Sequence, residues 1–231
     1  MTASAPATEP HEGLRFHERL KKSTWSEHQR TATSPYVREL LHGRVSRRDY
    51  AQLVIAHHFA YTVLEKAARE HAADPIVGRF VRTELYRVAA IEADLAELLG
   101  PGWRAEMEAT PAIKAYAAHL ETACAEPVAF VAHHYVRYLG DLSGGQIIAR
   151  RLAPVYGGEG LNFYAFGEIE DIDGFKTEYR ELLDTLPLDA DGHAALIAEA
   201  TVAYRFNGDI FDELTRRLAV DETADRDGRP E

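Results

Sequence analysis

Cysteine and positive charge are both scarce in this sequence. Cys124 is the one cysteine among 231 residues, so the chain cannot form an internal disulfide. Lysine and arginine number 26 against 37 aspartate and glutamate, which gives a formal net charge of -11. A protein that binds nucleic acid needs a dominant basic surface, so this composition argues against a nucleic-acid partner.

Long hydrophobic runs and a leader pattern are also missing. The apolar stretch 52–64 is interrupted by two histidines and is shorter than the roughly 20 residues that cross a bilayer. No N-terminal stretch shows the succession of charged, apolar and small residues that marks a signal peptide. We therefore expect a cytoplasmic protein without a membrane anchor.

Alternation of apolar and polar residues, the mark of a β-strand, is equally rare. Apolar residues instead recur at intervals of three and four, and helix-start signals such as Ser34 before Pro35 and Ser46 with Asp49 punctuate them. The fold class predicted by this pattern is all-α. Its helices are expected at roughly 10–31, 35–42, 47–72, 76–99, 111–124, 127–153, 172–186 and 190–219.

The sequence does not indicate separate domains. Hydrophobic residues make up 46% of the chain, enough for one sizeable core, and neither a Gly/Ser-rich linker nor an internal repeat divides it. The prediction is a single multi-helix domain over residues 11–220. Residues 1–10 and 221–231 offer few apolar side chains to bury, so we expect two flexible tails.

Three glycines lie in a segment whose other residues favour helix: Gly140, Gly144 and Gly145. Each costs about 1 kcal/mol relative to alanine inside a helix, so some other benefit must compensate. Gly140 and Gly144 share one face of a continuing helix, where a planar group has room to lie with Asp141 and Ser143 beside it. A helix end followed by a turn is the alternative. A phosphate loop is a weaker one, because the lysine and preceding strand of a Walker motif are missing.

The segment 137–146, Arg-Tyr-Leu-Gly-Asp-Leu-Ser-Gly-Gly-Gln, resembles the distal-helix signature of the heme oxygenase (haem oxygenase) family. The resemblance is closest to soluble bacterial members and runs from about residue 20 to 218, including Leu20-Lys-Lys-Ser-Thr and Tyr204-Arg-Phe-Asn. It implies a multi-helix fold in which heme is sandwiched between a proximal helix and the glycine-bearing distal helix.

The same resemblance implies an enzyme that opens the heme ring. Heme b would be both cofactor and substrate, and the products would be biliverdin, with the IXα isomer expected, carbon monoxide and ferrous iron. The reaction consumes O2 and electrons. Because no Gly-x-Gly-x-x-Gly fingerprint follows a strand, we expect an external electron donor, either a ferredoxin or an NAD(P)H-dependent reductase.

His28 lies in the first predicted helix, where a lone histidine is more often a surface or core residue than a ligand. The resemblance identifies it as the proximal heme ligand, which would bind iron through a neutral imidazole. Many family members carry a glutamate one turn later to hold the second ring nitrogen, and this chain has Ala32 instead. We therefore expect that nitrogen to bond to the carbonyl of Thr24 or to water.

Two pairs of adjacent histidines, His57-His58 and His133-His134, are further candidates for ligands. Adjacent helical residues point about 100 degrees apart and do not readily face one metal. We expect core or surface roles for all four.

Four side chains match the clamp that holds the heme propionates in the family: Lys21, Tyr135, Lys176 and Arg180. Lys21 precedes His28 by seven residues, two turns along the same helix face, and Lys176 and Arg180 are four residues apart. Solvent exposure is the usual fate of such basic residues on a helix. The joint match of all four favours the clamp.

The resemblance also places Tyr61, Arg137, Asp141 and Asn207 around a distal water network. Asp141 would keep that network oriented so that it supplies protons without ligating the metal.

Two other functions compete with this interpretation. A catalytically silent heme-binding or heme-sequestering protein would need the ligand and the clamp but not Asp141. A di-iron helical bundle needs two Glu-x-x-His motifs, and only Glu39-Leu-Leu-His42 has that spacing.

Overall fold

The structure, a computed structural model, describes the backbone of residues 13–227 and the side chains of residues 13–219. This part of the chain is helical and contains no strand, which confirms the all-α prediction. The α-helices are α1 (Phe16–Ser23), α2 (Trp25–Ala32), α3 (Pro35–Leu41), α4 (Arg47–Glu70), α5 (Val88–Leu99), α6 (Trp103–Glu106), α7 (Pro111–Ala123), α8 (Pro127–His134), α9 (Gln146–Tyr156), α10 (Ile172–Asp184) and α11 (Ala190–Asp227). Short 3₁₀ turns are η1 (Val77–Arg79), η2 (Thr83–Leu85) and η5 (Asn162–Tyr164), and two π-helical turns are η3 (Tyr135–Leu139) and η4 (Asp141–Gly145).

Side chains at the predicted helix starts form the expected caps. Ser34 accepts a hydrogen bond from the backbone N–H of Val37 at the start of α3, and Ser46 accepts one from Asp49 at the start of α4. Thr110 does the same for α7. These bonds satisfy N–H groups that have no partner within the helix, which is why the boundaries were legible in the sequence.

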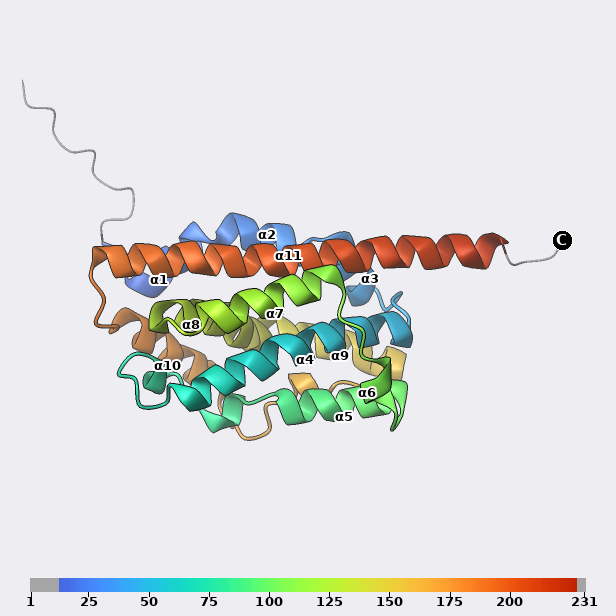
Figure 1. Cartoon of the computed structure of the whole chain (residues 1–231), viewed down its shortest axis with the longest axis horizontal. Coiled ribbons are helices and arrows are strands. Elements are labelled where there is room, and N and C mark those ends of the chain that lie inside the picture. The colour runs from blue at the N-terminus through green and yellow to red at the C-terminus, as the bar shows by residue number, and fades with distance from the viewer. Residues whose placement is uncertain (1–12, 228–231) are drawn as a thin grey trace, which may run out of the picture.

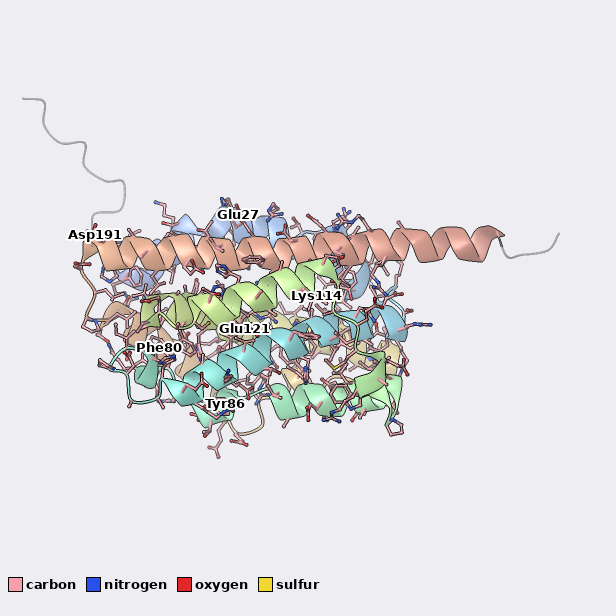
Figure 2. All side chains as sticks on the ribbon, in the orientation of Figure 1. Glu27, Phe80, Tyr86, Lys114, Glu121 and Asp191 are labelled. Atoms are coloured by element: carbon pink, nitrogen blue, oxygen red, sulfur yellow. The ribbon has the colours of Figure 1, made fainter. Side chains whose placement is uncertain are left out.

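The long helix α11 runs along one side of the molecule and α5 lies on the opposite side, with α7 and α4 between them (Figure 1). One hydrophobic cluster takes buried side chains from both ends of the chain, from Phe16 to Leu214. α11 packs against α2, α3, α7 and α8. At the α2 contact, Glu27 accepts a hydrogen bond from Arg205 of α11 at 3.2 Å, and Figure 2 shows Glu27 beside that helix.

The predicted helix 10–31 is interrupted at Thr24, between α1 and α2. Thr24 is buried, and its hydroxyl donates to the carbonyl of Leu20 at 2.8 Å. A threonine that bonds back to the carbonyl four residues earlier bends or ends a helix. The break turns α2 relative to α1 directly before the segment that carries His28.

The predicted single helix 76–99 is wrong, because only residues 88–99 form an α-helix there. Glu65 of α4 accepts hydrogen bonds from the backbone N–H groups of Arg87 at 2.5 Å and Val88 at 2.8 Å, so it caps α5 from another helix. The Arg87 guanidinium in turn donates to the carbonyls of Glu84, Leu85 and Ala165. Such long-range bonds override the local helix pattern.

At the C-terminal side, α11 continues as helix to Asp227, past the expected end near residue 219. The predicted N-terminal tail, residues 1–10, lies outside the described residues. No helix in residues 13–227 combines the length and the apolar character that would let it span a membrane.

Replacing Glu65 by alanine should lower the free energy of unfolding by roughly 3 kcal/mol, because one buried and one partly buried N–H group lose their acceptor. Urea denaturation followed by circular dichroism measures the loss. Glu70→Ala at the exposed end of the same helix is the matched control and should change stability by less than about 0.5 kcal/mol. Equal losses in the two variants would contradict the capping role.

Candidate functional site

The glycine-bearing segment is a continuous helical path from α8 through η3 and η4 into α9. Gly140, between the two π-helical turns, has helical φ and ψ angles of -62° and -47°. The continuing helix that was expected at 127–153 is therefore present, and the alternative of a helix end and turn at Gly140 is excluded. Single π turns inside α-helices are frequent at functional sites, and this segment has two of them on either side of Gly140.

The three glycines serve two different purposes. A Cβ atom on Gly140 or Gly144 would meet no atom within 4 Å, and both residues are exposed. A Cβ on Gly145 would lie 2.9 Å from the ring of Tyr164, so this glycine is required by internal packing. The open, side-chain-free strip therefore comprises Gly140 and Gly144, with the exposed Ser143 beside it.

His28 projects from α2 and is half-buried between two aromatic side chains. Its ring stacks on Trp25 at 5.0 Å between centroids and meets the edge of Tyr204 of α11 at 5.8 Å. Burial lowers the pKa of His28, and the nearby charge of Lys21 lowers it further. The imidazole is thus held in the neutral form that binds metals.

The second-nitrogen partner expected for His28 is not formed. The Thr24 carbonyl accepts the backbone N–H of His28 at 3.0 Å, and the buried Nδ1 atom of the ring has no hydrogen-bond partner among the described residues. Ala32, at the end of α2, offers no acceptor on its side chain. A buried ring nitrogen without a partner is costly, so Nδ1 is a place for an ordered water, while the other ring nitrogen, Nε2, is the one that would meet a metal.

The four expected clamp residues lie on three elements: Lys21 on α1, Tyr135 on η3, and Lys176 and Arg180 on α10. Tyr135 begins η3 and is buried; burial raises its pKa to about 12, against the opposing effects of Thr24 and the Arg180 charge. The Nζ atom of Lys21 lies 5.9 Å from the Trp25 ring centroid. Lys176 pairs with the exposed carboxylate of Asp173 at 2.7 Å.

The buried guanidinium of Arg137, in the π-helical turn before Gly140, holds side chains from two other helices. Arg137, 9% exposed, donates to Oδ1 of Asn207 at 2.6 Å and to Nδ1 of His57 at 2.6 Å. The amide of Asn207 is held by its own bond to the Ala203 carbonyl at 2.9 Å. Arg137 also lies over the ring of Tyr61, 5.0 Å from its centroid. The structure thus brings Arg137, Asn207 and Tyr61 together as expected.

Asp141 completes this distal network. Its carboxyl group accepts a hydrogen bond from the hydroxyl of Tyr61, and burial raises its pKa well above the usual value. A carboxyl group with a raised pKa holds its proton to a higher pH than an exposed carboxyl group does, which suits it to acid–base work.

His57 is the member of the network that the sequence analysis did not identify. It is buried, as expected for a core residue, but its Nδ1 atom accepts from Arg137 and its ring stacks on Phe163 at 4.5 Å. Burial, followed by the charge of Arg137, lowers its pKa well below the usual value, so it stays a neutral acceptor. His57 and Tyr61 are four residues apart on α4, so they share one face of that helix, and this spacing is the sequence feature that links His57 to the network.

Comparison with known proteins agrees with this geometry. The heme oxygenase family profile matches residues 14–213. Heme oxygenase 1 from Nostoc sp. is 34% identical over 204 residues, which cover 87% of this chain and 86% of that protein.

Solved structures agree as well. The crystal structure of heme oxygenase-1 from Synechocystis sp. in complex with heme has a TM-score of 0.85 at 30% identity and covers 92% of this chain and 99% of that one. Heme oxygenase-2 from Synechocystis sp., in complex with heme and NO, has a TM-score of 0.86 at 31% identity and covers 94% of each chain. The chain belongs to the heme oxygenase family.

Gly144→Leu should leave the fold intact, since the new side chain enters open space, but should weaken heme binding by more than roughly tenfold because it occupies the strip. A titration with hemin followed in the Soret region measures the affinity. Gly102→Leu is the matched control, because Gly102 precedes α6 and also faces open space. Unchanged heme affinity in Gly144→Leu would remove the strip from the site.

Proposed function

We propose that this chain binds heme b between α2 and the glycine-bearing segment, with His28 as the iron ligand, and cleaves the ring to biliverdin. As a heme oxygenase, the protein is an enzyme of heme degradation. The observation that carries the site is a half-buried histidine with a lowered pKa, His28, together with a strip at Gly140 and Gly144 that no side chain covers. A planar ring needs both.

Lys21, Tyr135, Lys176 and Arg180 are proposed to hold the two propionates. Tyr135 and Arg180 already influence each other, which places a hydroxyl donor beside a cation. Lys176 would exchange its exposed partner Asp173 for a propionate, and this exchange costs little because exposed ion pairs contribute at most about 1 kcal/mol. Charge-assisted contacts of this kind fix the rotation of the ring and thereby the meso carbon that is attacked.

The bound heme supplies both the iron that activates O2 and the ring that is oxidised. The chain's own proposed contribution on the distal side is to supply protons: burial favours the protonated form of the Asp141 carboxyl group, and Tyr61 donates a hydrogen bond to that group. Arg137, fixed by Asn207 and His57, keeps Tyr61 in place. Asp141 and Ser143 would order water next to the open strip and so deliver protons at a defined position.

The proposed products are biliverdin IXα, carbon monoxide and ferrous iron. O2 and a separate electron donor, a ferredoxin or an NAD(P)H-dependent reductase, are the proposed partners. The all-helical described part has no strand–glycine-loop–helix unit of the kind that holds a dinucleotide, so the electrons must come from another protein. A cytoplasmic location is proposed because the single buried Cys124 fits a reducing compartment.

A catalytically silent heme-binding protein is not favoured. Heme sequestration needs only the iron ligand and the propionate clamp. It does not need the buried carboxyl group of Asp141 or the buried guanidinium of Arg137.

The deciding experiment loads the full chain with hemin and adds a reductant in air. Loss of the Soret band with growth of a bilin band, and elution of the product with the IXα standard, is the expected result; persistence of the Soret band would favour the silent alternative.

His28→Ala should lower heme affinity by more than roughly tenfold and abolish turnover, because the iron loses its protein ligand. Added imidazole should restore the six-coordinate spectrum and part of the activity. The exposed His42→Ala on α3 serves as the control and should behave as the unchanged protein does. Normal turnover of His28→Ala without imidazole would show that another residue is the ligand.

Asp141→Asn should leave the heme affinity unchanged and reduce the rate of biliverdin formation on the order of a hundredfold, because the amide cannot hold the carboxyl proton. Binding is read from the Soret titration and turnover from product chromatography. Asp209→Asn, an exposed carboxylate on α11, is the control. A parallel loss of binding and turnover in Asp141→Asn would mean that the residue shapes the pocket rather than supplying protons.

A further inference from the structure

Three metal-ligating side chains converge at a place that the proposed heme chemistry does not use. His119 of α7, His133 of α8 and Glu199 of α11 bring their ligand atoms within 4.8 Å of one another. Oε1 of Glu199 lies 2.6 Å from Nε2 of His119 and 2.8 Å from Nε2 of His133. In the part of the chain that the structure describes, no fourth histidine, cysteine or carboxylate joins this group.

The donor set is the one that intermediate divalent transition ions prefer. Two imidazole nitrogens and one carboxylate oxygen bind zinc in three-ligand protein sites and ferrous iron in facial triads, whereas magnesium and calcium favour oxygen ligands alone. All three donors come from different helices that already pack together, so the set is assembled by the fold rather than by a flexible loop.

The surroundings of His133 also suit a metal ligand. Its ring is fully buried, and its Nδ1 atom faces the hydroxyl of Tyr116 at 3.3 Å, which leaves Nε2 directed at Glu199. A metal-bound histidine ordinarily has its other ring nitrogen held in this way by an outer partner. His119 and Glu199 are only partly buried, so an ion can enter and water can complete its coordination.

The geometry needs only a small adjustment to accept an ion. Two ligand atoms on one tetrahedral zinc ion lie about 3.3 Å apart, given bonds of about 2.0 Å. The nitrogen–oxygen distances here are 2.6 and 2.8 Å and must lengthen by roughly half an ångström, while the two imidazole nitrogens, which lie within 4.8 Å of each other, must reach the same separation of about 3.3 Å. Because His119 and Glu199 are partly exposed, their side chains can make that shift without moving a helix.

We propose that His119, His133 and Glu199 form a binding site for one divalent transition-metal ion of the zinc or ferrous type, separate from the heme site. The ion joins α7, α8 and α11 directly before the π-helical segment. His133 lies four residues before Arg137, so the ion braces the helix that carries the distal network. The inference stands on these residues and does not depend on heme turnover.

The test titrates Zn2+ into the full chain by calorimetry, once with hemin bound so that His28 is occupied and once without hemin. One equivalent of Zn2+ should bind in both forms, and Mg2+ should not bind. Glu199→Gln and His119→Ala should each weaken Zn2+ binding by more than roughly tenfold. Glu92→Gln is the matched control, because Glu92 also faces a histidine, His58, but already pairs with Arg104 and has no second imidazole.

X-ray absorption at the zinc edge of the unchanged protein gives an answer that needs no variant. The expected spectrum contains two imidazole ligands and oxygen, and the iron of bound heme does not interfere. The proposal is overturned if no equivalent of Zn2+ binds, if the spectrum lacks imidazole, or if Glu199→Gln binds Zn2+ as tightly as Glu92→Gln does.

Discussion

The burial of the Arg137 guanidinium is the constraint on which the distal half of the proposed site depends. A charge removed from water costs several kcal/mol unless its donors find acceptors, and Arg137 finds two, on α4 and on α11. Those two bonds fix the glycine-bearing segment between the two helices. The position of Arg137 in turn sets two others. The Tyr61 ring lies beneath the guanidinium, and the Tyr61 hydroxyl donates a hydrogen bond to Asp141.

The two sides of the proposed heme site are built by different means. On the distal side, Arg137 is held by hydrogen bonds to two neutral acceptors, although its buried Nε atom has no hydrogen-bond partner among the described residues. The proximal side is held by aromatic contacts: His28 lies between Trp25 and Tyr204, and nothing in the described residues fixes its second ring nitrogen. A histidine held by packing alone is less firmly oriented than one held by a carboxylate, so in the proposed function the distal residues would position the reaction more than His28 does.

Much of the fold was predictable because its signals are local. Ser34 and Ser46 cap the helices that they precede, and the glycine spacing correctly indicated an open helix face. The helix expected at 76–99 failed for the opposite reason, since its disruption comes from Glu65, more than twenty residues away in the sequence.

The chemistry-bearing residues divide in the same way. Asp141 and Arg137 lie within one recognisable motif, whereas the role of His57 depends on a bond to Arg137 of another segment, which its four-residue spacing from Tyr61 does not reveal. His119, His133 and Glu199 lie on three different helices, so no spacing in the sequence predicts that they form a cluster. Groups that only the tertiary structure brings together are the ones that sequence patterns miss.

The consecutive π-helical turns carry a consequence for how this protein can change over evolution. A π turn holds one residue more than an α turn, and each residue added to or removed from a helix rotates everything beyond it by about 100 degrees. Deleting one residue between Gly140 and Gly145 would relax the backbone towards ordinary helix, yet it would swing the bare strip away from α2 or misalign α9. The length of this segment is therefore fixed, whatever small side chains its exposed positions carry.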